Sequence, residues 1–385
     1  MDIGWFLRRK HHLTAALATA GVLGVVIVVG LVRRVDPAPS IPRQPAATAR
    51  AVAAIPPTAL PQPTDPPPPT TAPPATAPPA TDPRAQTLAS LRKVDEHPLY
   101  TMTYYGDYPV KLPTGVASAP AEAAPWGCSL FVTFADPAHV LFGRNFDWDD
   151  HPALLLFTDP PDGYAAVSMV DISYLGFDHH NLVELETLDG RAPLLRAPLL
   201  PFDGMNEHGL TVGMAAVDPS PFPNDPRKPT IGSLRIIRVL LDRARTTQEA
   251  LDLISGYNID FTGGPPIHYL IADRTGHAAV VEYRDGAMQV VRNDRPWLAA
   301  TNFYLAGASA AQRGQDERFA MLDSALNRAS GVLSAQAAMD LLAAVAQHHT
   351  RWSVVYDLTT GDIHLAMAKR YNRLHSFKLP SANLS

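Results

Sequence analysis

The stretch WGCSLFVTFADPAHVLFGRNFDW, residues 126–148, decides how the chain is organised. It holds the only cysteine, Cys128, directly after Gly127 and sixteen positions before Arg144. Two short apolar runs, 129–135 and 140–144, flank a turn at 136–139, which predicts a β-hairpin. Because the second strand of a hairpin runs back along the first, we expect Arg144 and Asp147 to lie near Cys128. The stretch therefore predicts one site with a thiol, a guanidinium and a carboxylate.

Composition limits the classes of protein to consider. The chain has 385 residues, but many of its 38 prolines crowd into one early segment, so we expect a single globular domain. The formal charge is −5, and no long basic run occurs beyond the N-terminus, so no nucleic-acid partner is expected. A single cysteine excludes an intramolecular disulfide and CxxC zinc sites. Neither a cofactor nor a metal site is expected.

A candidate membrane segment lies near the N-terminus. Arg8, Arg9 and Lys10 precede a mostly apolar run at about 13–32, and roughly twenty apolar residues can span a bilayer. The run is long for a cleaved signal peptide and no convincing cleavage site follows it, so residues 1–35 are interpreted as a transmembrane signal-anchor. Flanking charge favours a cytoplasmic N-terminus, with the rest of the chain membrane-anchored and extracytoplasmic.

Three further regions follow the anchor. Residues 36–84 are rich in Pro, Ala and Thr and cannot bury a core, which predicts a disordered, semi-rigid linker. Residues 85–127 return to ordinary composition and are interpreted as a pro-segment, and it stays open whether this segment remains bound after cleavage as an α-chain. Residues 128–385 form the expected catalytic domain.

The catalytic region has patterns of both strands and helices. Apolar runs predict strands at 154–158, 165–170, 210–216, 269–273, 278–283, 288–291, 354–358 and 363–367. Arg284-Asp285-Gly286 marks a hairpin between two of them. Helical periodicity occurs at 234–245, 246–254, 317–327 and 334–347. Because strands and helices come in separate runs, we expect an α+β fold of antiparallel sheets with helices on the outer faces.

A lone cysteine after glycine suggests a specific chemistry, although a buried structural thiol is an equally ordinary explanation. Glycine tolerates strained backbone, so the Gly127-Cys128 peptide could undergo an N-to-S acyl shift and cleave. The freed α-amine, with a typical pKa of about 7.7 to 8.0, could then act as base for its own thiol. Arg144 would favour the thiolate.

Five motifs together resemble a known family. They are Cys128, residues 143–148 (GRNFDW), residues 204–210 (GMNEHGL), Thr301-Asn302 and residues 351–356 (RWSVVY). Over about residues 88–376 the chain resembles the choloylglycine hydrolase family of linear amide C-N hydrolases. That group includes penicillin V acylase and bile salt hydrolase and is similar to acid ceramidase and the penicillin acyltransferases.

The resemblance implies the following fold and site. The fold would be an αββα sandwich of the N-terminal nucleophile (Ntn) hydrolases. Cys128 would be the nucleophile, with Arg144 beside its thiol and Asp147 orienting its α-amine. Asn302 would be an oxyanion donor, the main-chain N–H of Ala216 the other, and Arg351 the second arginine of the site. Cleavage would fall at Gly127-Cys128.

Several alternatives remain open at this stage. The acyl-enzyme could pass its acyl group to an amine, as an acyltransferase does, or the domain could be an inactive, surface-displayed binding relic. A papain-like site would need a histidine such as His208, His268 or His277. The paired histidines at 179–180 and 348–349 are explained as well by exposed positions as by a metal. Substrates would be small N-acyl amides chosen by loops such as 159–163 and 218–230. Relatives are often dimers or tetramers, so a homo-oligomer is open.

Overall fold

A computed structural model describes residues 82–108 and 127–379. The chain divides into two units, Met1–Pro74 and Ala75–Ser385, and every described residue lies in the second. The predicted signal-anchor, nearly all of the predicted linker and residues 109–126 of the predicted pro-segment lie outside the described residues. Among the helices that are described, none is both long and apolar enough to cross a membrane.

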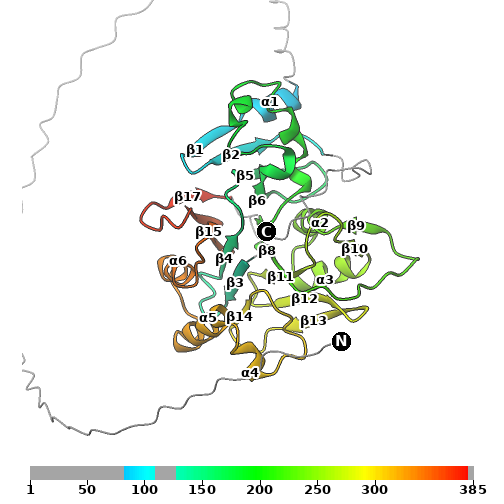
Figure 1. Cartoon of the computed structure of the whole chain (residues 1–385), viewed down its shortest axis with the longest axis vertical. Coiled ribbons are helices and arrows are strands. Elements are labelled where there is room, and N and C mark those ends of the chain that lie inside the picture. Colours follow the sequence, from blue (N-terminus) through cyan, green and yellow to red (C-terminus); the bar gives the residue numbers. More distant parts are fainter. Residues whose placement is uncertain (1–81, 109–126, 380–385) are drawn as a thin grey trace, which may run out of the picture. The chain divides into compact units, whose positions relative to one another are not determined.

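Two large sheets form the body of this unit (Figure 1). The first has nine strands in the order β1-β2-β5-β6-β7-β8-β11-β12-β13, and the second has six in the order β14-β3-β4-β15-β16-β17. The strands of the first are β1 Arg92–Asp95, β2 Leu99–Tyr104, β5 Ala153–Thr158, β6 Ala166–Asp171, β7 Asp203–Asn206, β8 Leu210–Ala216, β11 Ile267–Asp273, β12 Ala278–Arg284 and β13 Ala287–Arg292. Those of the second are β14 Trp297–Ala300, β3 Gly127–Thr133, β4 Leu141–Asp147, β15 Thr350–Asp357, β16 Asp362–Met367 and β17 His375–Lys378. A separate pair joins β9 Thr230–Gly232 to β10 Asn258–Asp260.

Helices cover the outer faces of both sheets. The α-helices are α1 Pro83–Ala89, α2 Arg235–Arg243, α3 Thr247–Ser255, α4 Ala310–Arg313, α5 Glu317–Arg328 and α6 Ala335–Ala344, with 3-10 helices at Ile172–Leu175, Leu182–Glu186 and Ala192–Leu199. Helices α5 and α6 pack on β3, β4, β14 and β15, whereas α2 and α3 pack on β7, β8 and β11. Strand β3 also contacts β8 across the interface between the sheets. The α+β prediction is therefore confirmed, with the layers helix, sheet, sheet, helix.

The predicted hairpin is strands β3 and β4. Their register pairs Cys128 with Phe146 and Leu130 with Arg144, and every residue of both strands is buried. Glycine suits position 143, because a Cβ there would lie 2.4 Å from the Phe131 ring and would force it to shift. Buried on both faces, the hairpin forms the centre of the interface between the sheets.

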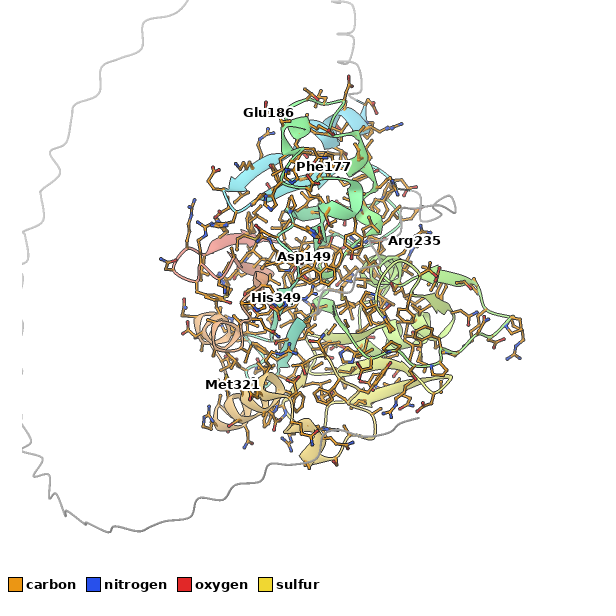
Figure 2. All side chains as sticks on the ribbon, in the orientation of Figure 1. Asp149, Phe177, Glu186, Arg235, Met321 and His349 are labelled. Carbon is orange, nitrogen blue, oxygen red and sulfur yellow. The ribbon has the colours of Figure 1, made fainter. Side chains whose placement is uncertain are left out.

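Local signals set the helix boundaries. The side chains of Thr246, Asp316 and Ser334 each accept a hydrogen bond from the N–H three residues on, at the starts of α3, α5 and α6. At the β12-β13 hairpin Asp285 and Gly286 both have positive φ, as the predicted turn needs. Not every apolar side chain of these helices faces the core: the labelled Met321 of α5 remains exposed at the surface (Figure 2).

The described part of the pro-segment was the least expected element of the fold. Strand β2 pairs in parallel with β5 over six residues, inside a sheet predicted to be antiparallel. Tyr100, Met102 and Tyr104 lie in a second apolar cluster with residues of β5, β6 and the 3-10 helices. Residues 82–108 therefore complete one end of the nine-stranded sheet.

Candidate active site

Cys128 is the second residue of β3, and its side chain is fully buried. The Nη2 atom of Arg144 lies 3.6 Å from its Sγ atom. This contact follows from the hairpin register, because cross-strand partners point to the same face and Arg144 lies two residues from the partner of Cys128. The predicted proximity of thiol and guanidinium is therefore observed.

The guanidinium of Arg144 is fully buried and held from several sides. It forms an ion pair with buried Asp203, and it donates to Phe202 O at 3.1 Å and to Met214 O at 3.2 Å. Asp203 in turn accepts from Trp352 Nε1 at 3.2 Å and from the Tyr356 hydroxyl at 2.6 Å. These contacts fix the guanidinium next to the thiol and offset its charge.

Two opposing effects act on the thiol. Burial raises the pKa of Cys128, while the charge of Arg144 lowers it, and burial dominates. The expected effect of Arg144 thus has the right direction but is outweighed while the chain is uncleaved. The thiol is held neutral in this arrangement.

Asp147 lies beside the peptide that would be cleaved. Its Oδ1 accepts from Thr350 Oγ1 at 2.5 Å, whereas nothing within the described residues hydrogen-bonds its buried Oδ2. A Cβ at Gly127 would lie 3.0 Å from that Oδ2 and 2.9 Å from Gln347 Nε2, so a larger residue would require these side chains to shift. Burial raises the pKa of Asp147, with Thr350 and Arg318 opposing. The carboxylate therefore has an unused acceptor next to the Gly127-Cys128 peptide.

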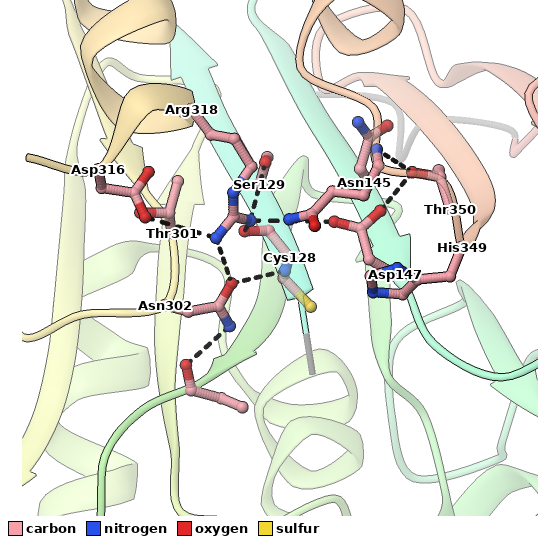
Figure 3. Close-up of polar contacts among 12 residues, drawn as sticks. Cys128, Ser129, Asn145, Asp147, Thr301, Asn302, Asp316, Arg318, His349 and Thr350 are labelled. Carbon is pink, nitrogen blue, oxygen red and sulfur yellow. Dashed lines mark hydrogen bonds and ion pairs between the residues drawn. The ribbon is translucent and has the colours of Figure 1, made fainter. Parts of the chain in front are cut away.

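Asn302 lies two residues after the end of β14 and contacts the backbone of Cys128. Its Oδ1 accepts from the Cys128 N–H at 2.8 Å, and its Nδ2 donates to Ala216 O at 2.8 Å (Figure 3). An amide nitrogen carries two N–H bonds, so one bond to Ala216 leaves the other available. Asn302 thus contacts the backbone of both Cys128 and Ala216, and its role as an oxyanion donor stays a prediction.

The N–H of Ala216 points toward the same region. The neighbouring N–H of Val217 donates to Pro266 O at 2.9 Å, so in an alternating ladder the N–H of Ala216 points away from β11. Strand β7 pairs with β8 only as far as Gly213, so Ala216 extends beyond that strand. The carbonyl of Met214, two residues earlier and thus on the same side, bonds to Arg144. The predicted second donor therefore points to the side on which Arg144 lies.

Arg351 has a different set of contacts from the other predicted site residues. Its guanidinium forms an ion pair with Asp150 and donates from Nε to His151 O at 2.8 Å. The register of β15 shifts between Thr350 and Trp352, which displaces the residue between them from regular alternation. Burial lowers the pKa of Arg351 to about 10. The structure thus brings Arg351 to the segment after β4 rather than to the Cys128 contacts described above.

Arg318 is a site residue that the sequence analysis missed. It donates from Nη1 to Cys128 O at 2.6 Å and from Nη2 to Asn302 Oδ1 at 2.9 Å, and its Nη1 lies 3.9 Å from Asp147 Oδ2 (Figure 3). It occupies the first turn of α5, where acidic side chains are normally favoured. A basic residue in the first turn of a helix was therefore the sequence signal that could have pointed to Arg318.

The candidate histidines of a papain-like site have other partners. His208 packs edge-on against Tyr164, and His277 bonds to Thr275. His268 pairs with Glu282.

His348 and His349 contact each other through their Nδ1 atoms at 3.2 Å. Within the described residues, no group of three or more His, Cys, Asp or Glu side chains could hold a metal ion.

A hollow of about 740 Å³ adjoins the loop that carries Asn302. Phe303 and Tyr304 line it on one side, and Asp218 to Pro221, the start of one predicted substrate loop, line it on another. The Tyr304 hydroxyl donates to Asp218 O at 2.7 Å and ties the two loops together. The 218–230 loop therefore contributes to a cavity near the site.

Comparison with solved structures identifies the class of fold. A mutant of conjugated bile acid hydrolase from Clostridium perfringens aligns with a TM-score of 0.50 at 14% identity, over 67% of this chain and 94% of that chain. Penicillin V acylase from Agrobacterium tumefaciens aligns with a TM-score of 0.46 at 15% identity, over 67% and 88%. The alignment with the bile acid hydrolase shows that the two chains share a sheet-rich α+β fold.

One family model matches part of the sequence. Residues 128–303 match the model of the linear amide C-N hydrolases, choloylglycine hydrolase family. A search of curated proteins found no significant match. The resemblance carried by the motifs is confirmed over residues 128–303, a match that begins at Cys128 and includes all the motifs except residues 351–356.

Proposed function

We propose that the chain cleaves itself between Gly127 and Cys128 and then hydrolyses linear amide bonds of N-acyl substrates through a thioester on Cys128. One observation carries the proposal: both atoms of the future nucleophile have partners suited to their roles. The Sγ lies 3.6 Å from Arg144, and the backbone nitrogen that would become the α-amine lies 2.8 Å from Asn302 Oδ1.

Maturation would proceed by an N-to-S acyl shift. The Cys128 sulfur attacks the Gly127 carbonyl carbon, the C–N bond breaks, and the proton of the thiol passes to the departing nitrogen. Water then hydrolyses the thioester, which leaves a Gly127 carboxylate and a free thiol. The α-amine that forms lies beside the unused Oδ2 of Asp147, which can accept from it.

Turnover would use the same atoms. The α-amine takes the thiol proton, the sulfur attacks the substrate carbonyl, and the resulting oxyanion accepts hydrogen bonds from Asn302 Nδ2 and the Ala216 N–H. The protonated α-amine then gives its proton to the leaving amine. Water enters and hydrolyses the thioester to release the acid.

The first experiment combines intact mass with N-terminal sequencing of the wild type and of Cys128→Ala. The proposal expects a fragment that begins at Cys128 in the wild type and an unbroken chain in the variant. A wild type that stays whole, while it is folded and pure, contradicts autocleavage.

Substrate class is tested on the matured protein. The panel is penicillin V, a glycine-conjugated bile acid and N-dodecanoyl p-nitroanilide, each with and without hydroxylamine as an acyl acceptor. Release of free acid supports hydrolysis, whereas a product that forms only with the acceptor would identify an acyltransferase. Matured protein that forms a thioester with none of the amides would contradict amidase activity.

We also propose that residues 1–35 anchor the chain in a membrane and that the linker displays the domain on the extracytoplasmic side. The support is the apolar run between basic residues. Protease added to intact cells should release the domain while leaving a cytoplasmic marker intact. Protection of the domain until the cells are lysed would refute this orientation.

A further inference from the structure

A histidine and a glutamate lie buried behind Asn302 and have no part in the chemistry described above. His268 is on β11 and Glu282 is on the neighbouring β12, and both are fully buried. His268 Nδ1 lies 3.1 Å from Glu282 Oε1, and its Nε2 lies 2.8 Å from Thr301 O. Thr301 is the residue immediately before Asn302.

The polar atoms of this pair are hydrogen-bonded on several sides. A carbonyl oxygen can only accept, so Nε2 must carry a proton. Glu282 already accepts from the N–H groups of Leu305 at 2.7 Å and Ala306 at 2.9 Å. Burial alone would raise the pKa of Glu282, yet His268 and these two N–H groups lower it overall. Glu282 Oε1 also lies within hydrogen-bond distance of Nδ1, so both ring nitrogens of His268 have a partner.

The pair holds the Asn302 loop at both ends. His268 fixes the carbonyl of the peptide that leads into Asn302, and Glu282 fixes the backbone three and four residues after it. Strand β11 also pairs with β8, where Ile267 lies opposite Ala216. Strand β11, which carries His268, is therefore linked to both expected oxyanion donors. It pairs with the strand of Ala216, and His268 contacts the residue before Asn302.

We propose that His268 and Glu282 are positioning residues that hold the loop 301–306, and through it the Asn302 amide, in register with Cys128. The inference rests on the proposed role of Asn302 as an oxyanion donor. The pair touches neither the thiol nor Arg144. It acts through the backbone of the loop 301–306, to which it is hydrogen-bonded. Since both side chains are fully buried, removing either one leaves the other without its hydrogen-bond partner.

The consequence is specific to reactions that pass through an oxyanion. Acylation by p-nitrophenyl acetate forms a tetrahedral oxyanion on the way to the thioester, so it needs the donor in place. Alkylation by iodoacetamide forms an S–C bond as iodide leaves and develops no oxyanion. Loss of one oxyanion donor costs about 10²- to 10³-fold, and a misplacement of about 1 Å costs about 10²-fold.

The experiment uses matured full-length chain of the wild type, His268→Gln and Glu282→Gln, with thiols counted by iodoacetamide. Both variants are expected to show a p-nitrophenyl acetate burst slower by about 10- to 100-fold per titrated thiol, with an alkylation rate within about twofold of wild type. The matched controls His139→Gln and Glu96→Gln change exposed side chains and should alter neither rate.

Three outcomes would overturn the inference. A burst within twofold of wild type shows that the pair does not position the donor. A parallel loss of alkylation shows a general structural role. Some variants could keep the wild-type unfolding temperature but fail to cleave themselves. That result would show that the pair is needed for cleavage of the chain, not for positioning the donor in the matured protein. Failure of the proposed function appears separately, as a wild type that is acylated by the ester but hydrolyses none of the amides.

Discussion

Residues 82–108 are expected to remain bound after the chain is cleaved at Gly127-Cys128, and Asp95 is the residue on which this can be tested. Its buried Oδ2 accepts from His375 Nε2 at 2.6 Å, its Oδ1 pairs with Arg370, and Arg373 Nε lies 3.7 Å away. All three basic partners belong to the last part of the described chain. Asp95 therefore joins the pro-segment to the region of β17.

The magnitude can be worked from burial. Six large side chains of the segment are less than 10% exposed: Leu91, Leu99, Tyr100, Met102, Tyr104 and Tyr108. Burying each is worth about 1.5 to 3 kcal/mol, so the set contributes on the order of 10 kcal/mol or more. Association itself costs about 4 to 15 kcal/mol, and the β2-β5 ladder and the Asp95 cluster add to the favourable side. The wild-type fragment should stay bound at micromolar concentration.

Asp95→Ala should weaken this association strongly. Breaking a buried ion pair by removing one partner costs about 3 to 5 kcal/mol, which raises the dissociation constant by about 10²-fold or more. Lys93→Ala removes an exposed ion pair on the same segment and is the control, because such pairs contribute about 0 to 1 kcal/mol. Gel filtration of the cleaved proteins, with mass spectrometry of each peak, measures the bound fraction.

The pH dependence has a definite sign. Burial would raise the pKa of Asp95, but hydrogen bonds from the His97 N–H, His375 and Arg370 lower it from 3.8 to about 2. A depressed carboxyl pKa stabilises the complex above about pH 4, and this contribution is lost as the pH falls through about 2. Wild-type fragments that separate at neutral pH, or Asp95→Ala fragments bound as tightly as wild type, would refute the reasoning.

Three further substitutions test the site and its surroundings. Asp203→Asn removes the carboxylate that faces buried Arg144 and should lower the free energy of unfolding by about 3 to 5 kcal/mol in urea denaturation; an unchanged midpoint would show that the pair is dispensable. Arg318→Gln loses the charged donors to Cys128 O and Asn302 Oδ1 and should slow the ester burst by about tenfold or more, against Arg328→Gln at the exposed end of the same helix; equal bursts would remove Arg318 from the site. Gly143→Ala places a Cβ 2.4 Å from the Phe131 ring and should cost about 1 to 3 kcal/mol of stability, measured by thermal unfolding; a stability equal to wild type would show that the ring can move aside.

The hairpin at the centre of the fold could be predicted because its information is local. Two apolar runs and a turn define β3 and β4, and the pairing of Leu130 with Arg144 follows once the turn is placed. The starts of α3 and α6 could be predicted equally well. Thr246 and Ser334 are N-cap residues, whose side chains accept a hydrogen bond from an N–H in the first turn of the helix. Periodicity and capping act over a few residues, so sequence alone carries them.

Features that depend on contacts between residues far apart in the sequence could not be predicted from the sequence. The parallel β2-β5 ladder joins residues on either side of the nucleophile strand, and no local pattern specifies such a partner. Arg351 matched a motif, yet a shift in register between β15 and β4 directs it to Asp150. Arg318 reaches Cys128 only because α5 packs on β3 and β14. Each depends on which elements meet, not on their own residues.

The charges around Cys128 suggest why the uncleaved chain would hold its thiol in check. Burial raises the thiol pKa, the charge of Arg144 is offset by Asp203, and the buried Oδ2 of Asp147 has no hydrogen-bond donor within the described residues. Cleavage at Gly127 would convert an uncharged peptide nitrogen into an amine that can carry a proton. That cation would supply the donor that Asp147 Oδ2 lacks and would favour the neighbouring thiolate. The same bond break would thus create the base, satisfy the carboxylate and lower the thiol pKa, so the precursor would react poorly with external substrates until the nucleophile is complete.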